Sequence, residues 1–241
     1  MSIDSEARRA ELVGNLARVR ARIAAAAAEA ARDAGEITLV TVTKFFPAED
    51  VRHLAALGIT DVGENRHQEA EAKAAACADL SALRWHYIGG LQSNKAAAVA
   101  RYADIVESVD RAKLLPGLAR GAAERGRALG VMVQVSLDQP GPVPDSQRAG
   151  VVPEDVLRLA DAIATDPHLH LLGVMAVAPL GADPAPAFER LAEVAAQVRT
   201  QHPEARAISA GMSGDLEEAI RFGATHVRIG SAILGNRPSN L

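Results

Sequence analysis

The chain has 241 residues, with a formal net charge of −4 at pH 7 and a pI near 6.0. Hydrophobic residues make up 49% of it and charged residues 23%, which is typical of a folded globular protein and not of a disordered one. The acidic charge and an aromatic content of only 3% offer little to nucleic acid or to an anionic membrane. We therefore expect neither as a partner.

The single cysteine, Cys77, allows no disulfide within the chain, which favours a reducing compartment. It lies in a helix-like run, EAEAKAAACADL, where a small buried thiol is more common than a nucleophile. The N-terminal thirty residues carry acidic side chains and lack the apolar core of a signal peptide. These features predict a cytoplasmic protein.

The first predicted element is a long helix over residues 5–34, which precedes the first strand. Gly35 follows it as a stop signal. Apolar residues recur at helical spacing along it, at Leu12, Leu16, Val19 and Ile23.

From there the chain alternates between short β-rich runs and alanine-rich amphipathic segments. The expected strands are residues 37–44, 59–64, 84–90, 104–110, 130–137, 170–179, 205–212 and 225–230. Apolar stripes predict helices over residues 153–165 and 184–201. Eight βα units with continuous apolar strands predict an α/β fold, a closed (β/α)₈ barrel over 37–235, with a doubly wound open sheet as the alternative.

No linker divides the chain, so residues 1–241 are expected to form one domain, in which residues 1–35 add a helix to the barrel. The one irregular segment is DQPGPVPDSQRAGVV, residues 138–152, which follows the fifth strand. Its prolines and glycines predict a long loop that could serve as a lid.

In a parallel barrel the chemistry lies where the strands end, and the first strand ends in VTVTKFFP with Lys44 at the rim. A lysine there is usually just solvated. An amine that forms a Schiff base must lose its proton part of the time, and an apolar collar or a nearby cation favours that loss. Phe45 and Phe46 are candidates for the collar, and Arg228 is a candidate for the cation.

Two Gly/Ser turns end the seventh and eighth strands, in SAGMSGDLEEAI and VRIGSAILG. Ser213 could act as an ordinary N-cap, but adjacent turns at these two positions of a barrel commonly bind phosphate. Arg228 lies in the middle of the last apolar strand, where a guanidinium is costly unless a partner meets it.

His86 and Asn65 also lie near strand ends. A strand histidine is usually packed and hydrogen-bonded, and His86 has no metal-binding spacing with the other histidines, so no metal site is expected. Met175, in GVMAV, is predicted from its context to pack inside the barrel.

The conjunction of Lys44 with DVGENRHQE, WHYIGGLQSNK, GVMAV, SAGMSGDLEEAI and VRIGSAILG closely resembles the YggS/PROSC family of pyridoxal phosphate homeostasis proteins from Ile37 to Gly235. Such proteins are single barrels similar to the N-terminal domain of alanine racemase, and they hold pyridoxal 5'-phosphate as an internal aldimine. The resemblance implies that Lys44 carries the cofactor covalently. It also implies that the cofactor is bound by Asn65, His86, Met175, Ser209, Met212, Arg228, Gly230 and Ser231, with Ser209, Gly230 and Ser231 in the phosphate cradle.

Arg228 would then face the pyridine nitrogen. Because arginine hardly ever gives up its proton, that nitrogen would stay unprotonated and the ring would be a poor electron sink. Racemases with this arrangement add a base from a C-terminal domain, and the chain ends six residues beyond Gly235. We therefore expect a carrier that buffers pyridoxal phosphate with little or no catalysis, a monomer whose partners could include apo-enzymes that use this cofactor.

Two other functions stay open: a fold-type III amino-acid racemase-like enzyme that uses pyridoxal phosphate, and a sugar-phosphate aldolase with a lysine imine but no cofactor. The chain also departs from the family pattern. Many members carry a second lysine where this chain has Phe46, and another in the loop where Arg148 is the nearest basic residue. Their C-terminal ends are often lysine-rich, whereas this one reads NRPSNL.

Overall fold

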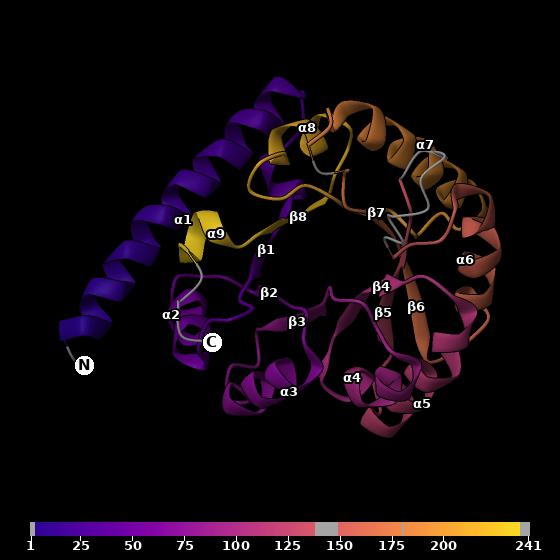
Figure 1. Cartoon of the computed structure of the whole chain (residues 1–241), viewed down its shortest axis with the longest axis horizontal. Helices are drawn as coiled ribbons and strands as arrows, with labels where there is room; N and C mark the ends of the chain where they lie inside the picture. Colours follow the sequence, from indigo (N-terminus) through magenta and orange to yellow (C-terminus); the bar gives the residue numbers. More distant parts are fainter. Residues whose placement is uncertain (1–2, 138–148, 180, 237–241) are drawn as a thin grey trace.

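The computed structural model describes residues 3–137, 149–179 and 181–236. Within these residues eight parallel strands close into a barrel in sequential order, with β8 paired to β1, and helices surround it (Figure 1). The predicted (β/α)₈ barrel is confirmed, and the open-sheet alternative is wrong. The strands are β1 Thr38–Val42, β2 Asp61–Glu64, β3 Arg84–Tyr87, β4 Ile105–Val109, β5 Leu129–Gln134, β6 Leu169–Met175, β7 Ala207–Ser209 and β8 His226–Ile229.

All eight strands fall inside the segments expected from the sequence, apart from one residue at the start of β5 and one at the start of β6. The α-helices are α1 Ile3–Glu29, α2 Ala48–Ala56, α3 His67–Ala76, α4 Ala96–Tyr102, α5 Leu115–Arg125, α6 Val156–Ala164, α7 Ala185–Gln201, α8 Leu216–Arg221 and α9 Ser231–Leu234. Four 3₁₀ turns stand beside them, at Ala34–Glu36, Ser93–Lys95, Ala112–Leu114 and Pro153–Asp155. None of the described helices is long and apolar enough to cross a membrane.

The long helix α1 lies across the outside of the barrel next to α8 and α9 (Figure 1). Its predicted stripe is buried there, with Leu12 at 0% and Leu16 at 2% exposure, against a cluster that includes Val227 and Ile229 of β8. Arginines of α1 tie it to the barrel layer: Arg8 forms a bidentate pair with Asp50 of α2 at 3.0 and 2.9 Å. This helix is therefore part of the barrel's outer shell.

The first helix ends five residues earlier than expected. Ala31 adopts a left-handed conformation with φ 53°, and the amide of Arg32 donates back to the carbonyl of Ala27 at 2.8 Å. This is the Schellman pattern that ends many helices, with alanine at the position where glycine is usual. Gly35 lies beyond it, in a 3₁₀ turn whose N-cap is Asp33.

Two apolar clusters fill the space between the barrel and its helices. One joins β1, β2, β3 and β8 to the surrounding helices including α1, and the other joins β3 to β7 to the helices α4 to α7. The stripe predicted for α7 is buried in the second cluster, with Phe188 2% and Leu191 1% exposed. Cys77, at the end of α3, is a buried thiol in the first cluster, as expected.

The barrel interior combines a small apolar layer with a polar centre. Ile105, Met132 and Met175 pack together inside, which confirms the packing role predicted for Met175. Beside them lie ionisable side chains from β2, β3, β4 and β8 that are at most 4% exposed. Because barrel interiors usually hold branched apolar side chains, this centre is the first structural sign of a specialised site.

Candidate functional site

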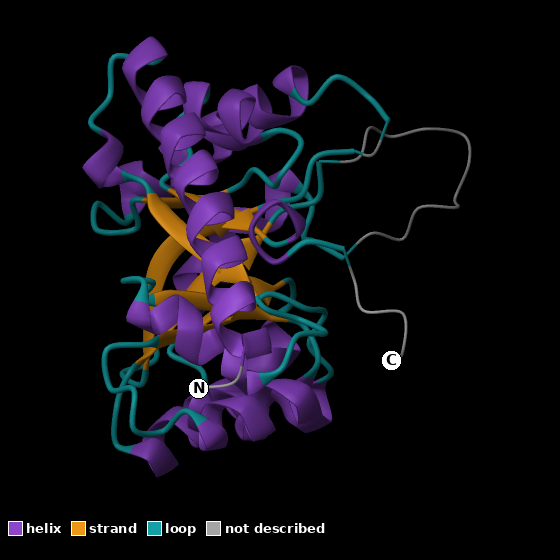
Figure 2. Ribbon diagram, turned by 90° about the vertical axis from the view of Figure 1, so that its left-hand side faces the viewer, coloured by secondary structure: helices purple, strands orange, loops and turns teal. Residues whose placement is uncertain are grey.

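The residues predicted for the site lie at or just inside the rim where the strands end. Lys44 follows β1, Asn65 follows β2, the turn 210–214 follows β7, and Gly230 and Ser231 follow β8. Because the strands are parallel, these loops share one end of the barrel, to the right in Figure 2.

Lys44 is half-buried, and within the described residues its amine has no hydrogen bond or ion pair. Its Nζ lies 5.9 Å from the centre of the Phe45 ring, so Phe45 does border the amine. Phe46 instead packs into the outer cluster, where the guanidinium of Arg8 lies 5.5 Å from its ring centre. Half of the expected apolar collar therefore faces α1 and not the barrel mouth.

Arg228 finds its partners inside the protein. Its Nη1 donates to Ser209 Oγ at 2.7 Å, and its Nη2 donates to the carbonyl of Ala176 at 2.8 Å. Glu107 Oε2 lies 3.8 Å from Nη1 and supplies the opposite charge. Burial lowers the pKa of Arg228 while Glu107 opposes that shift, and the guanidinium is fixed in one orientation at 4% exposure.

His86 is held between two carboxylates. Its Nε2 lies 2.8 Å from Asp61 Oδ1 and its Nδ1 lies 2.6 Å from Glu107 Oε1. Burial by itself would lower the pKa of His86, but the hydrogen bonds to Asp61 and Glu107 outweigh it and raise the pKa to about 9. Both ring nitrogens therefore carry protons at neutral pH, and the ring has no free nitrogen to offer a ligand.

Glu107 joins His86 to Arg228 across the barrel. Its second oxygen accepts a 2.5 Å hydrogen bond from Ser209 Oγ, the same hydroxyl that receives Arg228. Burial opposes the charge of Glu107, yet its bond with His86 and the charges of His86 and Arg228 keep its pKa below the usual range. Since β4 and β7 are not neighbours, this contact crosses the interior.

A line of alternating charge thus runs along the barrel from Asp61 to Arg228. Burial raises the pKa of Asp61, but hydrogen bonds from His86 and Arg84 more than reverse the shift, so this carboxyl stays ionised. Asp61 and Glu107 were missed by sequence reasoning. The available signal was an acidic residue inside each of the apolar strands ITDVGE and DIVESVD.

The two Gly/Ser turns meet, as their positions predicted. Ser231 Oγ lies 3.4 Å from Ser213 Oγ, which joins the turn after β8 to the turn after β7. Gly211 has φ +89°, a conformation that favours glycine, and its carbonyl accepts the amide of Arg228 at 2.9 Å. From α1, Arg22 donates to the carbonyl of Ser213 at 3.0 Å and steadies the first turn.

Two predicted residues near these turns have other partners. Ser209 lies below the turns, where its hydroxyl serves Glu107 and Arg228. The amide of Met212 donates to Asp215 Oδ1 at 2.6 Å. Asp215 also stands at the N-cap of α8, so the N-cap considered for Ser213 is wrong and its hydroxyl is left to Ser231.

Asn65 presents a buried side-chain oxygen that has no hydrogen-bond partner in the described residues. Its backbone is fixed from two sides. The hydroxyl of Tyr87 donates to its carbonyl at 3.4 Å, and a Cβ on Gly89 would lie 2.2 Å from the same oxygen, so only glycine fits there. A buried orphan acceptor at the rim is a place for a ligand's donor.

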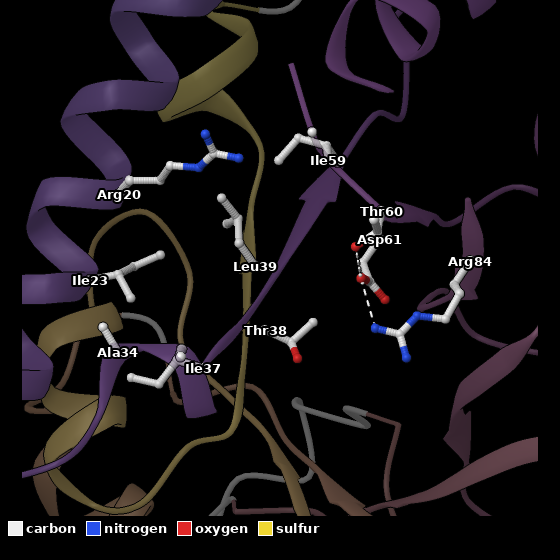
Figure 3. A pocket seen from close by; sticks show the side chains of 12 residues that line it. Arg20, Ile23, Ala34, Ile37, Thr38, Leu39, Ile59, Thr60, Asp61 and Arg84 are labelled. Atoms are coloured by element: carbon white, nitrogen blue, oxygen red, sulfur yellow. Dashed lines mark hydrogen bonds and ion pairs between the residues drawn. The ribbon is translucent and has the colours of Figure 1, made fainter. Parts of the chain in front are cut away.

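A pocket of about 460 Å³ lies at the opposite end of the barrel, where β1, β2 and β3 begin (Figure 3). Figure 3 shows Arg20 reaching in from α1 and Arg84 bonded to Asp61 on the other side. It contains none of the predicted cofactor-binding residues. The described residues hold no group of three or more His, Cys, Asp or Glu arranged to bind a metal ion.

Part of the sequence analysis concerns residues outside those described. The predicted lid falls there except for its last four residues, 149–152, and Arg148 and the C-terminal residues 237–241 lie there entirely.

Comparison with known proteins gives a consistent result. Residues 15–238 match the family described as alanine racemase, N-terminal domain. The pyridoxal phosphate homeostasis protein of Mycobacterium tuberculosis H37Rv is 44% identical over 248 residues, covering 95% of this chain and 94% of that protein. The Escherichia coli K12 protein of the same name is 36% identical, covering 94% and 97%.

Among solved structures, PipY of Synechococcus elongatus with pyridoxal phosphate bound is 33% identical with a TM-score of 0.78, covering 93% of this chain and all 100% of PipY. Alanine racemase of Corynebacterium glutamicum is 16% identical with a TM-score of 0.68, and the match covers 97% of this chain and 62% of the racemase. The racemase match concerns the fold alone.

Proposed function

Because the chain belongs to the family of pyridoxal phosphate homeostasis proteins, we propose that it is a carrier that holds pyridoxal 5'-phosphate covalently through Lys44 and buffers its free concentration, with little or no catalysis. One observation carries the proposal. A lysine amine without an ion pair in the described residues stands on the same rim as two joined Gly/Ser turns.

The covalent bond requires an amine that is free to attack. The cofactor supplies an aldehyde carbon, which an unprotonated amine attacks reversibly. The chain has four lysines, and one of them, Lys73, has its ammonium bonded to Thr43, Glu64 and Glu69. Among the described residues Lys44 has no such partners at the rim, which supports its role as the attacking amine.

The residues on the rim fit a phosphate ester. Ser231 begins α9, so backbone amides in this turn have no carbonyl earlier in the helix to bond. The hydroxyls of Ser213 and Ser231 are turned toward each other and offer further donors. We place the phosphate at these turns with Gly230, and we assign the unpartnered Asn65 Oδ1 to a polar group of the ring or its substituents.

Arg228 is proposed to face the pyridine nitrogen. Its bonds to Ser209 and Ala176 fix the guanidinium, and its charge is balanced by Glu107 inside the barrel. Arginine keeps its proton, so a ring nitrogen beside it stays unprotonated and withdraws few electrons. Strong carbanion chemistry is therefore disfavoured, which supports a carrier.

A racemase-like activity is the alternative, and the shared fold with alanine racemase is what favours it. The two functions differ at the α-carbon of amino acids. A carrier leaves the α-hydrogen in place, whereas a racemase exchanges it with solvent. Rapid deuterium incorporation into alanine or another amino acid, at enzyme-like turnover in the loaded protein, would replace the carrier by the alternative.

The experiment for the covalent bond is an absorption spectrum with chemical trapping. We expect the purified protein with pyridoxal phosphate to be yellow, to lose the colour with borohydride, and to yield a modified peptide that contains Lys44. Lys44→Ala should give no trapped adduct, whereas Lys113→Ala, at an exposed lysine, should behave as wild type. A trapped adduct in Lys44→Ala, or no adduct in wild type, would refute the proposal.

We further propose that the carrier acts as a cytoplasmic monomer and delivers the cofactor to apo-enzymes. The single cysteine supports a reducing compartment. Light scattering of the loaded protein at several concentrations checks the monomer, and transfer is checked by activation of an apo-aminotransferase beyond the rate given by free cofactor.

A further inference from the structure

The turn that carries Lys44 is held by a cluster of buried charges behind it. Lys73 lies in α3, which packs outside β2, and its Nζ is 2.7 Å from Glu64 Oε1, from Glu69 Oε1 and from the carbonyl of Thr43. An ammonium has three N–H groups, so Lys73 is saturated. We call Glu64, Glu69 and Lys73 the α3 clamp.

The clamp contacts the backbone on both sides of Lys44. Lys73 binds the carbonyl of Thr43, and Glu69 Oε1 accepts the amide of Phe45 at 2.6 Å. Glu64 accepts the hydroxyl of Thr43 at 2.6 Å. The peptide groups that precede and follow Lys44 are therefore both fixed by the same three side chains.

The turn needs this support because its backbone is unusual. Phe45 has φ 72°, a left-handed conformation that is costly for a bulky residue. It lets the amide of Phe46 close the turn onto the carbonyl of Thr43 at 3.1 Å. A residue stays in such a conformation only where its surroundings impose it, and the bonds to Glu69 and Lys73 do so here.

In the part of the chain that the structure describes, the Lys44 side chain has no such anchor of its own. Within the described residues its amine makes neither a hydrogen bond nor an ion pair. The backbone on either side therefore sets the direction in which this side chain leaves the main chain. The ammonium of Lys73 also balances the charge of Glu64 and Glu69 through one oxygen of each, which weakens their attraction for the Lys44 amine.

We propose that the α3 clamp is a positioning device, in which Lys73, Glu64 and Glu69 set the turn at residues 43–46 so that the Lys44 amine is aimed into the barrel mouth and left unpaired. All three side chains come from one short segment, GENRHQEAEAK, residues 63–73. Glu69 and Lys73 are four residues apart on α3, which places them on one face of the helix.

The α3 clamp proposal takes its ligand, pyridoxal 5'-phosphate, from the proposed function. Binding of two related compounds tests the clamp. Pyridoxal 5'-phosphate reports the bond to Lys44, whereas pyridoxine 5'-phosphate lacks the aldehyde and reports phosphate and ring binding alone. We expect Lys73→Met to weaken binding of pyridoxal 5'-phosphate about tenfold or more, because the turn would be free to leave the left-handed conformation of Phe45. The free-energy cost of one left-handed residue is equivalent to about that change in affinity. Binding of pyridoxine 5'-phosphate should stay within about twofold, and Lys113→Met should change neither.

Three further variants guard against misfolding. Lys73→Met leaves buried carboxylates without a cation, so Glu64→Gln/Lys73→Met removes one charge with its partner and should show the same selective loss. Glu69→Gln keeps an acceptor for the amide of Phe45, so it should retain most of the affinity for pyridoxal 5'-phosphate. Glu69→Ala removes that acceptor and should lose the affinity. Equal loss of both ligands, or unchanged binding of pyridoxal 5'-phosphate, would overturn the clamp.

Hydrogen exchange of the Phe45 amide separates this result from the proposed function. The bond to Glu69 protects that amide in the protein without ligand. Exchange should accelerate in Lys73→Met and Glu69→Ala and stay slow in Glu69→Gln. If wild type forms no adduct, the carrier proposal fails while this measurement still decides the clamp, and unchanged exchange in all variants would refute it.

Discussion

Two histidines of the barrel, the buried His86 of β3 and the half-buried His226 at the start of β8, make stability depend on pH. The pKa of His86 is raised to about 9, while an unfolded histidine titrates near 6.5. Between pH 6.5 and pH 9 the native state holds a proton that the unfolded state has lost. The free energy of unfolding therefore falls by up to about 1.4 kcal/mol for each unit by which the pH rises. The stabilisation is complete below pH 6.5, is lost as pH rises through 9, and amounts to about 3 kcal/mol.

His226 acts in the opposite direction. Burial lowers its pKa to about 4, so the unfolded state binds the extra proton between pH 4 and 6.5, and stability rises with pH there. The optimum is therefore expected near pH 6.5. Urea unfolding from pH 4 to 10 measures both the acid limb and the alkaline limb of this stability curve. The protein is first treated with hydroxylamine, which removes any bound aldehyde.

Single substitutions assign each limb to its histidine. His86→Gln should flatten the alkaline limb of the stability curve. It should also lower the free energy of unfolding overall, because Asp61 and Glu107 lose their shared cation. His226→Asn should flatten the acid limb. The reasoning fails if wild type shows equal stability at pH 6.5 and 9. It also fails if the alkaline slope survives in His86→Gln.

Two predictions concern packing. Gly211→Ala should lower the free energy of unfolding by more than about 2 kcal/mol, since φ is +89° and the new Cβ would lie 2.7 Å from the Cβ of Ala219. The same distortion of the turn should weaken binding of pyridoxine 5'-phosphate. Gly214→Ala in the same turn meets no atom within 4 Å and should cost little, so equal losses in thermal unfolding would contradict this account. Leu12→Ala should lower the free energy of unfolding in urea by about 2–5 kcal/mol, because Leu12 is fully buried on the barrel-facing side of α1. A decrease under about 1 kcal/mol would mean that α1 is not packed on the barrel.

The fold could be predicted because hydrophobic period and turn residues act locally. Most strands are short apolar runs that end in Gly, Ser, Asn or Pro, and the stripe of α7 has the spacing of a helix. The pairing of the two Gly/Ser turns also followed, since β7 and β8 are neighbours in any barrel of this order. The end of α1 did not follow, because Ala31 takes a conformation that alanine rarely adopts.

The polar centre could not be predicted because it depends on contacts across the barrel. Glu107 and Ser209 are 102 residues apart, and no local pattern joins them. Likewise, Phe46 lies beside Arg8 of α1 and directly follows Phe45, whose left-handed conformation a phenylalanine rarely adopts and local propensity does not predict. Sequence reasoning could select Arg228 and His86 as unusual, but the number of charges that balance them came from the folded barrel.

Arg228 and Lys44 are held in different ways, and the difference suits a carrier. Arg228 is fixed through its side chain, by Ser209, Ala176 and the charge of Glu107. Within the described residues Lys44 is held only through its backbone, which leaves its amine available for the reversible bond that we propose. A catalyst would need a further group that takes a proton from the substrate, and His86 cannot be that group because both its nitrogens are bonded to carboxylates. The proposed capture and release would need only the amine, the two joined Gly/Ser turns and a guanidinium that keeps its proton.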